Sequence, residues 1–135
     1  MMTRFPLLLT ALTALLTDCT QSLPPSNVAG TYVLEAVNGT PVPLPGINAP
    51  VGGTITLTAA GNAQRRISYT VDSQGTVREF VAAGTYQLNG SDLRLALQQG
   101  SSLWSPAASL VGTSITLTYP NPADGPDIVE LYRER

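Results

Sequence analysis

The chain has 135 residues and a formal net charge of −2, and charged residues make up only 12% of it. This length is typical of one domain, and without a basic stripe the sequence excludes nucleic-acid binding driven by the phosphate backbone. There is one Cys, so an intrachain disulfide framework is excluded, and there is no His or Lys, which removes Ser-His-Asp, Cys-His and Schiff-base catalysis.

Residues 1–18 are predicted to be an export signal. Arg4 precedes an apolar run at residues 7–16, which is shorter than the roughly 20 residues that a membrane-spanning helix needs. The stretch "LLTDCTQ" that follows resembles the lipobox of bacterial lipoproteins, with Cys19 at the acylated position. Asp18 departs from the small residue that usually stands before the Cys.

The lipobox resemblance implies that Cys19 becomes a lipid-bearing N-terminus. More than one acyl chain would then hold the protein firmly on a membrane of the bacterial cell envelope, facing the periplasm or the exterior. Residues 19–29 are polar and Pro-containing, which is typical of a flexible tether. The alternative is cleavage by the general signal peptidase, which would release a soluble periplasmic or secreted domain.

From residue 30 onward, apolar and polar side chains alternate with a period of two, as in "TITLT" at 54–58 and "LRLAL" at 93–97. Such alternation predicts half-buried antiparallel strands. We expect eight strands, at 30–37, 52–59, 64–72, 76–88, 92–98, 103–110, 113–119 and 127–133.

Turn residues separate these runs at the short spacing of β-hairpins, and no segment after the tether has a helical pattern. The loop at 38–50 holds four prolines and is expected to lie outside the sheet, while the long strand at 76–88 is expected to bend at Gly84. The predicted fold is therefore an all-β, eight-stranded antiparallel up-and-down barrel over 30–135, because closure removes exposed strand edges.

Three stretches carry a resemblance to a known family: "VAGTYVLEAVNGTPVPLP" at 28–45, "GTYQLNGSDLRLAL" at 84–97 and "ELYRER" at 130–135. They resemble small lipocalin-like, calycin-type bacterial lipoproteins, which implies a lipocalin-like barrel. In lipocalins an Arg of the last strand packs over an aromatic ring of the first. The resemblance therefore implies a barrel-closing cation–π pair of Tyr32 and Arg133.

Large rings are the candidate ligand-pocket residues, because an eight-stranded barrel is either filled by its own side chains or holds one small ligand. They are Tyr69, Phe80, Tyr86 and Trp104. The expected function is a non-enzymatic envelope lipoprotein that binds a small apolar ligand. The alternative is a structural or protein-interaction module whose loop at 38–50 or outer face meets an envelope partner.

Three carboxylates and three arginines are further candidates for chemistry. Glu35, Glu79 and Glu130 lie in predicted strands, where two carboxylates would suit acid/base catalysis, but we expect them to be solvated or paired with Arg. Arg65, Arg66 and Arg78 flank a predicted hairpin and could form a patch for an anionic ligand. Neighbouring strand residues point to opposite faces, so Arg65 and Arg66 cannot both face one site, and we expect them to be solvated or paired across strands.

The final loop offers oxygen ligands that would suit Ca²⁺, namely Asn121, Asp124, Asp127 and Glu130. These residues match no calcium-loop spacing, and the same residue types build a wide turn. We therefore expect no metal, no cofactor and no catalytic residue.

Overall fold

The computed structural model describes residues 28–135, and every regular element within this range is a β-strand. The strands are β1 (Gly30–Val37), β2 (Thr40–Pro41), β3 (Pro50–Leu57), β4 (Asn62–Thr70), β5 (Val77–Asn89), β6 (Asp92–Gln99), β7 (Ser102–Trp104), β8 (Ala107–Val111), β9 (Ser114–Tyr119) and β10 (Ile128–Glu134). In this described part, no helix is long and apolar enough to cross a bilayer.

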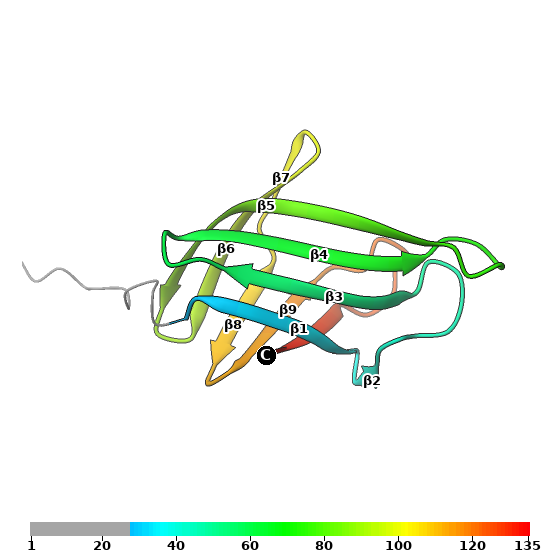
Figure 1. The fold of residues 1–135 in the computed structure, drawn as a ribbon, viewed down its shortest axis with the longest axis horizontal. Coiled ribbons are helices and arrows are strands. Elements are labelled where there is room, and N and C mark those ends of the chain that lie inside the picture. The colour runs from blue at the N-terminus through cyan, green and yellow to red at the C-terminus, as the bar shows by residue number, and fades with distance from the viewer. Residues whose placement is uncertain (1–27) are drawn as a thin grey trace, which may run out of the picture.

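Eight of the strands form one closed antiparallel circuit, in which β1, β3, β4, β5, β6, β8, β9 and β10 follow one another in sequence order. The circuit closes where β10 pairs with β1, for example Leu34 with Tyr132 and Val37 with Glu130. Figure 1 shows the strands wrapping around a common interior. The predicted eight-stranded antiparallel up-and-down barrel is confirmed.

The two remaining strands correct the predicted boundaries. The single strand expected at 103–110 is two strands, because Pro106 lies between β7 and β8 and cannot donate a ladder hydrogen bond. β7 instead folds back on β6 as a short hairpin that projects from the barrel in Figure 1. The loop at 38–50 was expected to lie wholly outside the sheet, but Thr40 and Pro41 pair with β1.

The core consists of the side chains that point inward from each strand, and they pack in one cluster. The alternation that predicted the strands accounts for it, since alternate Leu or Ile residues are buried at the end of β3, in β6 and in β9. The largest apolar or aromatic side chains that are fully buried are Tyr32, Tyr132, Ile55, Leu57, Ile67, Leu93, Leu97, Ile115 and Leu117.

The two ends of the barrel differ. At one end lie Val28, where the described chain begins, and the short turns before β4, β6 and β9. At the other end lie the β4–β5 hairpin, the loop between β2 and β3, and the loop at 120–127. We call this second end, on the right in Figure 1, the mouth.

Candidate ligand-binding recess at the barrel mouth

A buried ion pair crosses the barrel interior. Arg65 points inward from β4 and Glu130 points inward from β10, with only 5% and 1% of the side chains exposed. The Arg65 Nη2 donates to both carboxylate oxygens of Glu130, at 2.8 Å to Oε1 and 2.6 Å to Oε2. The Arg65 Nε donates to Oε1 at 3.1 Å. Such charge-assisted bonds are about twice as strong as neutral ones.

Two tyrosines complete this group, which we call the ionic cluster: Arg65, Tyr119, Glu130 and Tyr132. The Tyr132 hydroxyl donates to Glu130 Oε1 at 2.5 Å and accepts a bond from Arg65 Nε at 3.2 Å. The Tyr119 hydroxyl donates to Glu130 Oε2. Each carboxylate oxygen of Glu130 therefore accepts bonds from both the arginine and a tyrosine.

The environment keeps the donors of the ionic cluster protonated. Burial, followed by the Glu130 carboxylate, raises the pKa of Tyr119 and of Tyr132 well above the ordinary value of 10.0. Burial by itself lowers the pKa of Arg65, but the neighbouring oxygens of Tyr132 and Glu130 outweigh it, so that pKa is raised. With its carboxylate occupied and its donors held protonated, the cluster is poorly suited to general acid/base chemistry.

Two aromatic rings flank the guanidinium of Arg65. Its Cζ lies 5.0 Å from the Trp104 ring centroid and 5.9 Å from that of Tyr119, which is within cation–π range. The two rings meet edge to face, with centroids 5.3 Å apart and an interplanar angle of 80°. The positive charge thus lies under a corner formed by two aromatic side chains.

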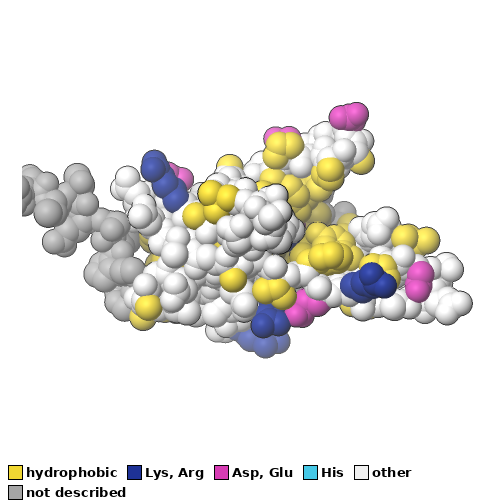
Figure 2. Space-filling view, turned by 90° about the horizontal axis from the view of Figure 1, so that it is seen from above, with side chains coloured by type: hydrophobic (Ala, Val, Ile, Leu, Met, Phe, Trp, Pro, Cys, Tyr) yellow, Lys and Arg dark blue, Asp and Glu magenta, His cyan; other side chains and the backbone are white. Residues whose placement is uncertain are grey.

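Above this corner is a cavity of about 240 Å³, which we call the mouth recess. It is lined by Arg65, Tyr69, Gln99, Trp104, Tyr119, Pro120 and Pro122. Figure 2 shows hydrophobic side chains gathered in a hollow between two protruding lobes, on the side away from the start of the described chain. The sequence brings these residues together because β4, β6, β7 and β9 all end or turn at the mouth.

One nitrogen of the buried arginine takes no part in the ionic cluster. Nη1 of Arg65 donates no hydrogen bond to any residue of 28–135. Across the same residues, every buried side-chain nitrogen or oxygen atom has a hydrogen-bond partner. Nη1 is therefore not fully buried, and Arg65 is one of the residues that line the mouth recess.

The structure brings together most, not all, of the rings predicted to form a pocket. Tyr69 and Trp104 line the mouth recess, and Phe80 packs edge to face on Tyr69 at 5.7 Å, with 47% of its side chain exposed. Tyr86 lies elsewhere: its hydroxyl donates to the Thr58 carbonyl at 2.8 Å, near the opposite end of the barrel. It lines a separate depression of about 380 Å³ between β5, β6 and β8.

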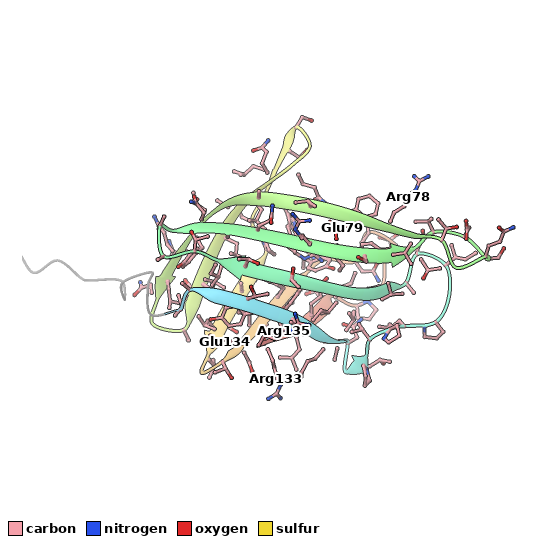
Figure 3. All side chains as sticks on the ribbon, in the orientation of Figure 1. Arg78, Glu79, Arg133, Glu134 and Arg135 are labelled. Atoms are coloured by element: carbon pink, nitrogen blue, oxygen red, sulfur yellow. The ribbon has the colours of Figure 1, made fainter. Side chains whose placement is uncertain are left out.

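The structure does not bring Tyr32 and Arg133 together. Tyr32 pairs in register with Glu134 and is buried inside, while Arg133 lies opposite Val33 and therefore points outward. Arg133 Nε donates to Glu35 at 2.7 Å, and Figure 3 shows its side chain projecting away from the barrel wall. An outer-face ion pair thus replaces the expected cation–π contact, because adjacent strand residues face opposite sides.

The other two carboxylates in the strands are each paired with an arginine, one outside the barrel and one inside it. Glu79 on the outer face pairs with Arg66 at 2.7 Å, with both side chains about half exposed. Glu130 is also paired with arginine, but inside the barrel. The sequence placed Arg65 and Arg66 on opposite faces, but the pairing of Arg65 with Glu130 was not predicted. A signal for it was present: Ile67 and Tyr132 are buried, and each stands two positions from one of the two charged residues, so it points to the same side of its strand.

The loop residues weighed as calcium ligands form a turn instead. The side-chain oxygen of Asn121 accepts the Ala123 amide at 2.9 Å, and Glu130 belongs to the ionic cluster. In residues 28–135 there is no group of three His, Cys, Asp or Glu side chains able to hold a metal ion.

The predicted signal, the tether and the lipidation residue Cys19 lie outside the described residues. No family model, curated protein or solved structure matches the chain in the comparisons made. The resemblance to lipocalin-like lipoproteins therefore stays a prediction.

Proposed function

We propose that this protein is a non-enzymatic lipoprotein of the bacterial cell envelope whose lipocalin-like barrel binds one small, mostly apolar molecule in the mouth recess. The observation that supports the proposal is the recess itself, which three aromatic side chains line together with a buried arginine. Concave, mostly apolar sites with a few placed polar groups are typical of small-molecule binding.

The size of the recess favours a compact ligand. Its volume of about 240 Å³ lies below the roughly 300–1,000 Å³ of sites that take drug-sized molecules. A molecule of one or two rings suits this space better than a long acyl chain. The interior below the recess is occupied by the ionic cluster and by the core side chains around Ile67 and Leu97.

The placement of the mouth agrees with a tethered binding protein. The described chain begins at Val28, at the end of the barrel opposite the mouth recess. A tether that leads from a lipid on Cys19 into this end would leave the mouth facing away from the membrane. Ligand would then enter from the aqueous side.

Native mass spectrometry and fluorescence of Trp104 test this function, because Trp104 is the sole tryptophan. We expect the protein purified from its host to carry a small bound mass, and the extracted molecule to change Trp104 fluorescence saturably when added back. Tyr69→Ala should weaken this binding, while Tyr86→Phe, at the far end, should not. Absence of both a bound mass and a fluorescence change would overturn the carrier function.

A protein-interaction role is the second candidate, and exposed apolar side chains on β5 and on the loop at 38–50 favour it. Ile47, Val77, Phe80 and Val81 are 43–56% exposed. The amide of Asn48, next to Ile47, donates to Thr70 of β4, so the loop at 38–50 lies beside the β4–β5 hairpin. A photo-crosslinker at position 47 should capture an envelope protein in intact cells if this role holds, and its failure to do so would count against it.

A further inference from the structure

We infer that the ligand of the mouth recess is an uncharged, planar compound that presents a carbonyl oxygen to Nη1 of Arg65. The inference rests on the proposed function and specifies its ligand class. The evidence is the set of hydrogen bonds made by the Arg65 side chain, of which only 5% is exposed.

The guanidinium has N–H donors that no residue of 28–135 accepts, and Arg65 lines the recess. An arginine carries five N–H groups. Nε and Nη2 donate to Glu130 and Tyr132, which leaves the N–H groups of Nη1 without an acceptor among the described residues. A ligand without an acceptor would displace water from a charged donor and would form no hydrogen bond in its place. A carbonyl oxygen supplies the missing acceptor.

The charges around the recess disfavour an anionic ligand. The positive charge of Arg65 is already matched by Glu130 at 2.6 Å, so an added anion meets a neutral pair. The exposed charges on the neighbouring segments have both signs, since Arg78 stands opposite Tyr69 in the sheet and Asp124 and Asp127 belong to the loop that supplies Pro120 and Pro122, so they add no net attraction for an anion. A carboxylate ligand would therefore lose its hydration without a full counter-charge.

A cationic ligand is disfavoured for a different reason. The ring faces of Trp104 and Tyr119 that would attract it already hold the Arg65 guanidinium. A second cation would lie beside that charge in a place of low dielectric. An uncharged ligand avoids both costs, and a planar one can pack on the rings that line the recess.

Four probes of similar size separate these possibilities: acetophenone, ethylbenzene, benzoate and benzylamine. All carry one phenyl ring, and they differ in whether the substituent is a carbonyl, an apolar group, an anion or a cation. Binding can be followed in NMR titrations by the indole N–H signal of Trp104, the sole tryptophan. We expect acetophenone to bind about tenfold or more tighter than ethylbenzene, and tighter than either charged probe.

The outcomes against the inference are distinct from those against the function. Equal affinities for acetophenone and ethylbenzene, or tightest binding by benzoate or benzylamine, would overturn the ligand class while leaving a binding recess. If none of the four probes bound, the proposed function itself would fail, and the inference with it. The probe series needs only the unaltered protein, so it does not depend on whether a variant folds.

A pair of double variants then tests the role of Arg65 directly. Arg65→Met with Glu130→Gln removes both charges from the interior, and Arg66→Met with Glu79→Gln makes the same changes in the exposed pair on the outer face. With folding checked by circular dichroism, the preference for acetophenone over ethylbenzene should fall close to onefold in the inner variant only. A tenfold preference that persisted in a folded inner variant would overturn the assignment to Nη1.

Discussion

Arg65 and Glu130 carry opposite charges into an interior that otherwise consists mainly of apolar and aromatic side chains. They are separated by 65 positions in the chain and belong to strands that are not neighbours in the sheet, so their bonds cross the barrel. A shift of one residue in the register of either strand would turn one charge to the outer face. We therefore regard the pair as a constraint on register as well as part of the recess.

Removing one partner should cost more stability than removing both. Glu130→Gln leaves the Arg65 charge buried without its counter-charge, and we expect a loss of about 3–5 kcal/mol in the free energy of unfolding. Arg65→Met with Glu130→Gln should lose clearly less than the two single changes added together. Urea denaturation measures all three values.

The outer-face pair is the matched control for this cycle. Arg66→Met and Glu79→Gln, singly or together, should change the free energy of unfolding by no more than about 1 kcal/mol, because exposed ion pairs contribute little. Additive losses at Arg65 and Glu130 would show that the two side chains do not act as a unit.

Buried tyrosines make the barrel sensitive to alkaline pH. Burial raises the pKa of Tyr32, Tyr86, Tyr119 and Tyr132 above 10.0. A raised pKa means that the folded state holds a proton that the unfolded state releases. The contribution of these tyrosines to the free energy of unfolding is therefore fully present below about pH 10, and it is lost as the pH rises from there towards their raised pKa values.

We expect these tyrosines to ionise together with unfolding, which absorbance at 295 nm and far-ultraviolet circular dichroism can follow in parallel. Tyr119→Phe removes one such proton and should make the fall in stability with pH less steep. Ionisation of four tyrosines near pH 10 in a protein that keeps its β-sheet spectrum would contradict this prediction.

At the scale of elements, the spacing between β5 and β6 depends on a missing side chain. A Cβ built on Gly84 would lie 1.9 Å from the carbonyl oxygen of Ala96, which is far inside van der Waals contact. β5 runs for 13 residues and arches along the barrel in Figure 1. Glycine at this point lets β6 approach β5 closely while the long strand continues.

Gly84→Ala should therefore be destabilising, by about 1–3 kcal/mol or more, since the clash involves backbone that cannot turn aside. Gly52→Ala is the control, because a Cβ there meets nothing within 4 Å and Gly52 has no positive φ. We expect that variant to change the free energy of unfolding by about 0.5 kcal/mol or less. Similar melting temperatures for the two variants would show that β6 shifts without cost.

At the scale of the whole molecule, the barrel has a recess at one end and the start of the described chain at the other. This polarity gives the proposed lipid anchor a specific consequence, since a membrane-bound barrel would offer its recess to the surrounding solution. A soluble protein with the same recess would instead act as a diffusible carrier. The state of Cys19 decides between these two roles.

The intact mass of protein from the host membrane fraction tests the anchor. We expect the mass of residues 19–135 plus a diacylglyceryl group and a further acyl chain, and a Cys19→Ala variant without that addition. An unmodified mass in the soluble fraction would exclude the anchor. Residues 19–29 would then not act as a tether to a membrane.

The strands were predictable because their signal is local. In β3, β6 and β9 an apolar residue stands at every second position, and this period alone identifies a half-buried strand and its turns. The strand at 103–110 was misjudged because the apolar residues around Pro106 hid the missing amide donor. The sequence also separated Arg65 from Arg66, since neighbours in a strand face opposite sides.

By itself, the sequence determined the all-β class, the eight main strands and the hairpin connections that make the barrel, because these depend on residues close together in the chain. The tertiary structure alone decided which charged residues meet inside the barrel. It placed Arg65 of β4 against Glu130 of β10 and under Trp104 of β7. Such contacts arise only when the sheet closes, because closure sets the register between strands that the chain keeps far apart.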